Sequence, residues 1–192
     1  MDAVGPLHGA TESDVRAGAE LLRGTRELAR GEHFLEAGMV ADEFAIVASG
    51  VLREYFVLPD GLERTKAFVA RGEPTGSLAD LLSGGPSRAF ITALESSRVM
   101  FGSWADLRAL AARSMAWSRL QCDVLETMFV RKAEREYELI GLDAEARYTA
   151  FVVRYPELES RVAARHIASY LGITPEHLSR LRKRRRDRGE PR

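Results

Sequence analysis

Residues 114–140 form a run of about 27 residues that contains neither glycine nor proline. Both residue types interrupt helices, so the run predicts one continuous helix about 40 Å long. Its apolar residues recur at spacings of three and four, and such a broad face can serve two neighbours. One neighbour would be a domain of the same chain and the other the same helix of a second chain; burial within one subunit is the alternative. The residues expected at the dimer interface are Trp117, Leu120, Gln121, Val124 and Met128.

Residues 31–103 show a different sequence pattern, with short β-type runs separated by glycine and proline. Asp60 and Gly61 follow Pro59 between two such runs and predict a β-hairpin. Many short strands with frequent turns favour a jelly roll or a sandwich, because closing or stacking the sheets shelters their edges. A helix is expected before them, over residues 11–24. The five expected strands cover residues 44–47, 51–58, 65–69, 90–94 and 98–101.

Residues 163–186 carry the most informative pattern, two short helices joined by a sharp turn. Gly172 can adopt the left-handed conformation that turns the chain between them. Thr174 is a good N-cap, and Pro175 takes the first helical position, where its missing N–H is not needed. The residues expected to pack between the two helices are Ile167, Ala168, Leu171, Leu178 and Leu181.

The second of these helices would present one polar face, which begins at Glu176 and continues at i+3, i+4 and i+7. An arginine can donate two hydrogen bonds to guanine, and a glutamate can accept one from cytosine. The pattern predicts a helix-turn-helix that binds double-stranded DNA, while Glu176 and Arg180 also fit an ordinary i,i+4 helix pair. The residues expected to contact DNA are Thr174, Glu176, His177, Ser179, Arg180, Lys183 and Arg184.

Charge is divided unevenly along the chain, although the net charge is zero. Residues 161–192 contain ten basic and three acidic residues, whereas the preceding 160 contain eighteen basic and twenty-five acidic ones. Such asymmetry indicates a polyanionic partner at the basic end, with a solvated basic tail as the alternative.

With these parts placed, the chain resembles the Crp/Fnr family of bacterial regulators over almost its full length. Residues 167–180 carry the most specific match, and Glu176, Ser179 and Arg180 are similar to the base-reading set of the Fnr-like branch. The resemblance implies an α+β fold with a double-stranded β-helix (jelly-roll) domain over residues 1–112. A dimerisation helix follows over 113–140, and an all-α helix-turn-helix domain over 141–192. It also implies a homodimer on palindromic DNA, with RNA polymerase as a further candidate partner.

The chain departs from the family in the phosphate-binding stretch. Cyclic-AMP-responsive members place a glutamate and an arginine at the positions where this chain has Ser77 and Ser87. Arg88 is one residue away, and a slip of one residue on a strand turns a side chain to the opposite face. Cyclic AMP is therefore not expected as the ligand, and any effector is unidentified. The candidate effector pocket comprises Gly76, Ser77, Leu78, Ala79, Ser87, Arg88 and Ala89.

A second departure follows the recognition helix, where family members usually continue into a β-hairpin wing. Residues 182–192 are rich in arginine and contain no pattern for a strand pair. The basic end is then expected to supply the phosphate contacts itself, or DNA binding becomes weaker and more dependent on salt.

Composition limits the other functions. Cys122 is the only cysteine and the four histidines are scattered, so no metal site and no cofactor are expected. An enzyme of the cupin type would need a His-x-His metal set, which the chain does not have. No apolar run is long enough to span a membrane and residues 1–10 do not resemble a secretory signal, so a cytoplasmic, non-enzymatic protein is expected. A ligand-binding or interaction module that binds nucleic acid only non-specifically is the remaining alternative.

Overall fold

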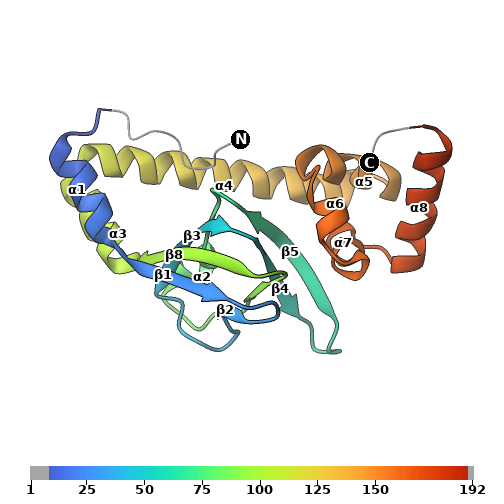
Figure 1. Ribbon diagram of the computed structural model, residues 1–192, viewed down its shortest axis with the longest axis horizontal. Helices are drawn as coiled ribbons and strands as arrows, with labels where there is room; N and C mark the ends of the chain where they lie inside the picture. The colour runs from blue at the N-terminus through green and yellow to red at the C-terminus, as the bar shows by residue number, and fades with distance from the viewer. Residues whose placement is uncertain (1–8, 190–192) are drawn as a thin grey trace. The chain divides into compact units, whose positions relative to one another are not determined.

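The computed structural model describes residues 9–189, so the expectations for residues 1–8 and 190–192 lie outside the described part (Figure 1). The helices are α1 (Glu12–Leu21), α2 (Leu78–Ser83), α3 (Trp104–Arg113), α4 (Met115–Gly141), α5 (Ala144–Arg154), α6 (Leu158–Arg161), α7 (Ala164–Leu171) and α8 (Pro175–Asp187). The strands are β1 (Leu22–Leu28), β2 (His33–Leu35), β3 (Glu43–Ser49), β4 (Val51–Val57), β5 (Glu63–Ala70), β6 (Pro74–Thr75), β7 (Phe90–Ala93) and β8 (Ser97–Ser103). The α+β class with a β-roll, a long helix and C-terminal helices is confirmed.

The chain divides into two compact units. Unit 1 contains the residues up to Phe56 together with Ala67–Phe129, and unit 2 contains Val57–Lys66 together with the chain from Val130 onward. Helix α4 therefore contributes its first half to unit 1 and its second half to unit 2. No helix among residues 9–189 is long and apolar enough to cross a lipid bilayer.

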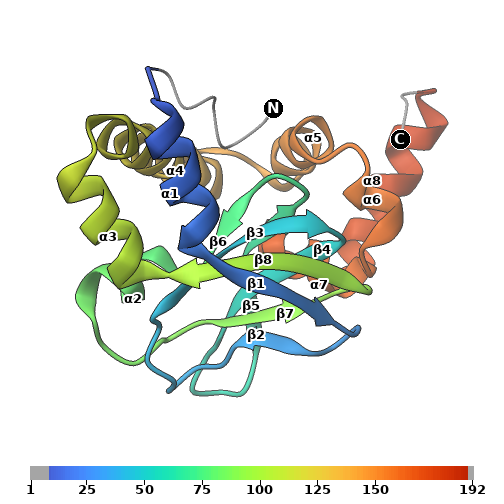
Figure 2. The same ribbon diagram turned by 60° about the vertical axis from the view of Figure 1, so that its left-hand side comes forward.

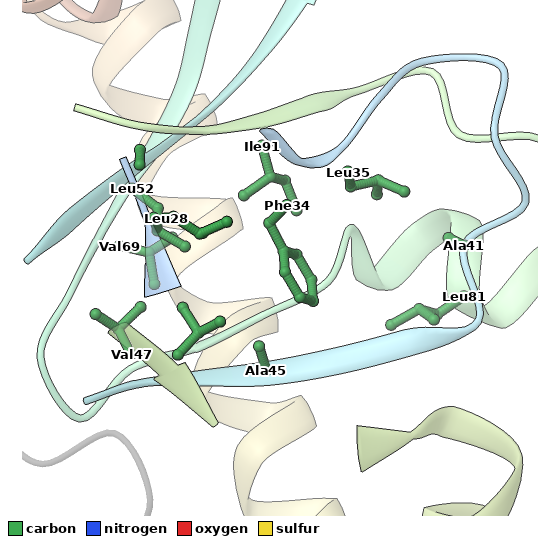
Figure 3. Packing of buried hydrophobic residues seen from close by; sticks show 12 residues of the cluster. Leu28, Phe34, Leu35, Ala41, Ala45, Val47, Leu52, Val69, Leu81 and Ile91 are labelled. Carbon is green, nitrogen blue, oxygen red and sulfur yellow. The ribbon is translucent and has the colours of Figure 1, made fainter. Parts of the chain in front are cut away.

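The strands form two four-stranded sheets, in the orders β1-β8-β3-β6 and β2-β7-β4-β5. Strand β8 pairs antiparallel with both β1 and β3. Apolar side chains from both sheets meet between them, where Ala45 and Val47 lie opposite Leu52 and Ile91, with Phe34 between them (Figure 3). These side chains are almost fully buried, so the interior of the roll is filled by the protein itself.

The hairpin predicted at Asp60 and Gly61 is confirmed between β4 and β5. Gly61 has a φ of +81°, and its N–H donates to the carbonyl of Leu58 at 2.8 Å. The Asp60 carboxylate accepts from the N–H of Leu62 at 3.0 Å and closes the turn.

Three strands were not among the five expected from the sequence: β1, β2 and β6. The helix expected over residues 11–24 ends at Leu21, and the prediction is wrong beyond that residue because Leu22 already begins β1. A bulge between Leu22 and Gly24 lets the chain change from helix to strand within one turn. Strands β2 and β6 have only three and two residues, too few for a periodic signal.

The long helix is confirmed as α4, which begins one residue after Ser114 and ends at Gly141. Figures 1 and 2 show α1 beside the first turns of α4. There the indole Nε1 of Trp117 donates to the carbonyl of Asp14 at 3.0 Å. Gly18 of α1 permits this approach, since a Cβ at that position would lie 2.3 Å from the Trp117 ring.

Candidate nucleic-acid interface

Helices α7 and α8 of unit 2 form the predicted helix-turn-helix around Gly172. This glycine has φ 67° and ψ 34°, the left-handed conformation that the turn requires. Ile167 and Leu171 of α7 and Leu178 of α8 have 0% exposure, and Ala168 is also buried. The apolar residues expected between the two helices therefore lie there, and they fix the direction of α8 from the protein interior.

The start of α8 is built as the sequence predicted. Thr174 is the N-cap, and its side-chain oxygen accepts from the N–H of His177 at 3.2 Å. Pro175 is the first helical residue. The cap and the proline together fix the first turn of α8, from which the polar residues project.

The polar face of α8 is exposed at every position expected to contact DNA except His177, which is half-buried. The exposed residues of that set are Thr174, Glu176, Ser179, Arg180, Lys183 and Arg184. Hydrogen bonds from its own backbone N–H and from Thr174, with the charge of Arg180, lower the pKa of Glu176. Glu176 is therefore an anion and a hydrogen-bond acceptor near neutral pH.

Three arginines of the basic end contact other residues of unit 2. Arg182 donates to the Glu159 carboxylate at 2.9 Å and to the Glu159 carbonyl at 3.2 Å. Arg188 pairs with Glu145, and the Arg185 guanidinium lies 5.9 Å from the centre of the Tyr148 ring. These arginines hold α8 to α5 and α6.

Four other cations of α8, Arg180, Lys183, Arg184 and Arg186, are exposed. Within residues 9–189 none of them has a salt-bridge partner. Since like charges repel, an anion that binds to this group would relieve the repulsion among its members. A polyanion is the partner that such a face fits.

Tyr148 of α5 also helps to hold α8 in place. Its hydroxyl donates to Glu159 at 2.6 Å, and Glu159 also binds Arg182. Burial, followed by the hydrogen bond to Glu159, raises the pKa of Tyr148 to about 12. The hydroxyl is thus a fixed donor across the physiological range.

A buried ionic cluster supports α7 from the second half of α4. Glu138 is 6% exposed and accepts from Arg135 at 3.1 Å and from Arg154 at 2.7 Å. The Arg135 guanidinium lies 3.8 Å from the centre of the Tyr170 ring and also donates to the Tyr170 carbonyl. Arg154 donates to the Tyr170 hydroxyl at 3.1 Å. The cluster therefore ties α4, α5 and α7 into one scaffold, which sequence periodicity could not reveal.

Within unit 2, Ser169 of α7 is hydrogen-bonded to the first residues of β5. Its hydroxyl accepts from the N–H of Thr65 at 2.9 Å and donates to the carbonyl of Glu63 at 3.0 Å. The side of α7 that carries Ser169 is therefore occupied by this strand.

The phosphate-binding stretch of unit 1 is organised around a buried carboxylate, that of Asp80. Asp80 is 3% exposed and accepts from the Ser77 hydroxyl at 2.7 Å and from the Ser87 hydroxyl at 3.1 Å. The N–H and Nε of Arg88 donate to it at 3.1 and 3.2 Å. Burial opposes ionisation, but these hydrogen bonds together outweigh it and lower the pKa of Asp80. The residue was missed from the sequence, where it stands alone among leucines.

The seven residues of the candidate effector pocket do not share one surface. Ser77, Ser87, Gly76 and Ala89 are buried, whereas Ala79 is exposed and the Arg88 side chain is 75% exposed. Ser77 has a φ of +52°, a rare conformation for a residue with a side chain. Its hydrogen bond to Asp80 holds it there, so the stretch is fixed by its own contacts.

The five residues expected at the dimer interface lie on one cavity of unit 1, which Trp117, Leu120, Gln121, Val124 and Met128 line together with residues of α1, β3 and α3. Other apolar residues of α4 are largely exposed and do not line this cavity. They include Phe129 (70%), Tyr137 (66%) and Ile140 (83%).

No group of three or more His, Cys, Asp or Glu side chains that could hold a metal ion occurs in residues 9–189. His33 lies 3.3 Å from the Tyr55 hydroxyl, and Cys122 is an exposed thiol on α4.

A β-roll joined to a helix-turn-helix defines the class of protein, and the comparisons with known proteins agree. The model of the cyclic nucleotide-binding domain matches residues 25–114. FixK2 from Bradyrhizobium japonicum is 20% identical, with 86% of this chain and 85% of that one covered and a TM-score of 0.78. The c-di-GMP-responsive global regulator CLP from Xanthomonas campestris is 15% identical, covers 93% of both chains and has a TM-score of 0.71.

The catabolite activator protein from Thermus thermophilus is 24% identical, with 96% of this chain and 88% of that one covered and a TM-score of 0.58. No curated protein matches this chain in sequence. Residues 25–114 thus match the cyclic nucleotide-binding domain model, and the chain has the fold of the Crp/Fnr transcription regulators. The resemblance predicted from the sequence is confirmed.

Proposed function

We propose that the protein is a transcription regulator that binds palindromic DNA sequence-specifically as a homodimer. This proposal rests on the exposed face of α8. It combines Glu176 and Arg180, which can bind base edges, with Lys183 and Arg184, which can bind phosphates. The α8 helix enters the major groove in this proposal, as the second helix of a helix-turn-helix does.

The dimer in this proposal forms along α4, and exposed apolar residues favour its second half. Val130, Ala133, Tyr137 and Ile140 are exposed and follow one another at spacings of three, four and three. This is the spacing of a two-stranded coiled-coil seam, and no other part of unit 2 within the described residues, up to 189, buries them. Two copies of α8 would then bind two half-sites about one DNA turn apart.

Cyclic AMP does not control this regulator in our proposal. Its phosphate would need donors, but the hydroxyls of Ser77 and Ser87 already donate to Asp80. The carboxylate would also repel the phosphate across a buried site. The Asp80 network thus acts as a structural element, and the domain keeps its fold without a cyclic nucleotide.

Selection of binding sites from random DNA by the full chain, with and without cyclic AMP, tests the proposal. We expect enrichment of one palindromic sequence with two half-sites, unchanged by cyclic AMP. The matched variant Arg180→Ala should lose preference at one base pair of each half-site. Recovery of no sequence, or of a single half-site, would contradict the specific dimer, and enrichment only with cyclic AMP would contradict the role given to Asp80.

A further inference from the structure

Helix α8 has two sides with separate sets of basic residues. Its inner side packs on the rest of unit 2 and carries Leu178, Leu181, Arg182, Arg185 and Arg188. Its outer side is exposed and carries Glu176, Ser179, Arg180, Lys183, Arg184, Arg186 and Asp187. With about 3.6 residues per turn, the inner set falls within an arc of about 120° and the outer set within an opposite arc of about 160°.

Arg184 and Arg186 form the two edges of the outer side. Residues two apart on an α-helix project about 160° away from each other, so the rest of the outer set, including Glu176 and Arg180, falls between these two arginines. Both arginines are exposed, and neither has a salt-bridge partner within residues 9–189. A guanidinium is therefore available to an anion at each edge of the polar face.

Asp187 separates these two cations. It is exposed and projects between Arg184 and Arg186, near the line of Glu176. Its carboxylate also has no salt-bridge partner in the described part of the chain. An anion that approached the middle of this last turn would meet Asp187, whereas anions on either side would meet an arginine. This charge pattern fits two separate anionic chains better than one.

We infer that Arg184 and Arg186 bind phosphates of the two opposite strands of DNA, so that the last turn of α8 spans the major groove. An α-helix with its side chains is about 10–12 Å wide and the groove about 12 Å, so side chains on opposite sides of α8 reach opposite rims. The two arginines follow Glu176 by about 12–15 Å along the axis, beyond the N-terminal residues that contact base edges in a helix-turn-helix. They position the helix across the groove and read no sequence.

The inference adds Arg186 to the residues expected from the sequence to contact DNA, and gives Arg184 a strand opposite to that of Arg186. It rests on the proposed function in taking DNA as the partner, but it requires neither sequence preference nor a palindrome. Binding of DNA without sequence preference would therefore overturn the proposed function and leave the two phosphate contacts measurable.

The salt dependence of binding to a scrambled duplex tests the two contacts, with fluorescence anisotropy of the full chain as the readout. Each phosphate contact releases counterions, so the logarithm of the association constant falls with that of the salt concentration by about 0.9 per contact. Arg184→Gln and Arg186→Gln should each make this slope shallower by about 1 per bound chain, and the double variant by about 2. A wild-type slope in either single variant, or a double variant no shallower than the single ones, would overturn the inference.

Arg188→Gln is the matched control. It removes an exposed guanidinium two residues beyond Arg186, but one that pairs with Glu145 on the inner side. Its slope should equal that of the wild type, and thermal unfolding verifies that every variant is folded. An equal change in Arg188→Gln would mean that the slope follows net charge alone, which would overturn the assignment to Arg184 and Arg186.

Phosphate ethylation interference on the selected palindrome assigns the strands. With the wild-type chain, ethyl groups on phosphates at both rims of the major groove should block binding in each half-site. Arg184→Gln should abolish this interference on one strand, and Arg186→Gln on the other. Loss on the same strand in both variants, or on neither, would overturn the inference that α8 spans the groove.

Discussion

Charged groups are arranged in opposite ways around Asp80 of unit 1 and on helix α8 of unit 2. In the first, the buried Asp80 carboxylate is surrounded by donors from Ser77, Ser87 and Arg88. In the second, Arg180 and Lys183 are exposed without a salt-bridge partner among the described residues. Charge that is satisfied within the chain stabilises the fold, whereas charge left unsatisfied is available to an external partner.

This difference indicates that a polyanion binds at α8 and not at the roll. The cyclic-AMP-responsive members of the family that this chain resembles bind an anion at both places, a cyclic phosphate in the roll and DNA at the helix-turn-helix. Between these two places, exposed cations without a salt-bridge partner among the described residues lie on α8, whereas Arg88 of the roll is paired with the buried Asp80 carboxylate.

Separating the two copies of α8 should have the largest effect. Tyr137→Glu places a charge in the proposed seam, so light scattering should detect monomers, and affinity for a palindrome should fall about 100-fold or more. Unit 1 should keep its stability, since the Asp80 network lies within one chain. Thr127→Glu, an exposed position away from the seam, is the control.

The same experiment decides between the two sets of α4 residues. Val124→Glu tests the interface expected from the sequence, and we expect it to destabilise unit 1 while the dimer persists, because Val124 lines the cavity. Monomers from Val124→Glu and an intact dimer in Tyr137→Glu would reverse this assignment.

Arg180→Ala should weaken binding to the selected palindrome by about 1–3 kcal/mol per half-site. Binding to scrambled DNA should change little, because Arg180 is assigned to a base edge. Arg186→Ala, which removes a neighbouring exposed cation, should weaken both duplexes equally. Equal losses in Arg180→Ala would reduce that residue to a phosphate contact.

Asp80→Asn should lower the free energy of unfolding of unit 1 by about 1–3 kcal/mol at neutral pH, because it weakens a buried hydrogen-bonded network. The folded-state pKa of Asp80 is lowered, so the ionised carboxylate stabilises the fold fully above the unfolded-state pKa of about 4. This stabilisation is lost as the pH falls through the lower, folded-state pKa. Denaturant unfolding of both proteins from pH 7 to pH 3 should show the difference shrinking. A constant difference would mean that the charge of Asp80 is irrelevant.

Thr174→Ala should have the smallest effect, about 1 kcal/mol less stability for unit 2. Thr174 satisfies the N–H of His177 through its side chain, and alanine leaves that donor to water. Thr174→Ser retains the oxygen and should unfold at nearly the wild-type denaturant concentration. A full loss in Thr174→Ser would indicate that the methyl group, and not the cap, contributes the stability.

The helix-turn-helix could be predicted from the sequence because its signals are local. Gly172, Thr174 and Pro175 each specify a backbone conformation within a few residues, and Leu178 returns at helical spacing. The long helix of α4 was predictable for the same reason, since absence of glycine and proline is a property of the sequence itself.

The Asp80 network and the cavity depend on contacts that the sequence does not display. Asp80 binds Ser87 and Arg88 across a turn, and a carboxylate among leucines gives no hint of its partners. Similarly, Trp104 and Trp117 come together only because α3 and α4 pack on the same side of the roll. The apolar stripe of α4 was recognised, but whether each residue faces inward or outward is decided by that packing.

Fluorescence anisotropy measures whether the ligand-free protein binds DNA sequence-specifically, with a palindromic Fnr-type duplex and a scrambled duplex at near-physiological salt. We expect selective binding of the palindrome with a Kd of roughly 10⁻⁸ M or tighter, since the roll needs no cyclic nucleotide in our proposal. Weak and equal binding of both duplexes near 10⁻⁶ M, together with tight binding only after addition of cyclic AMP, would contradict it.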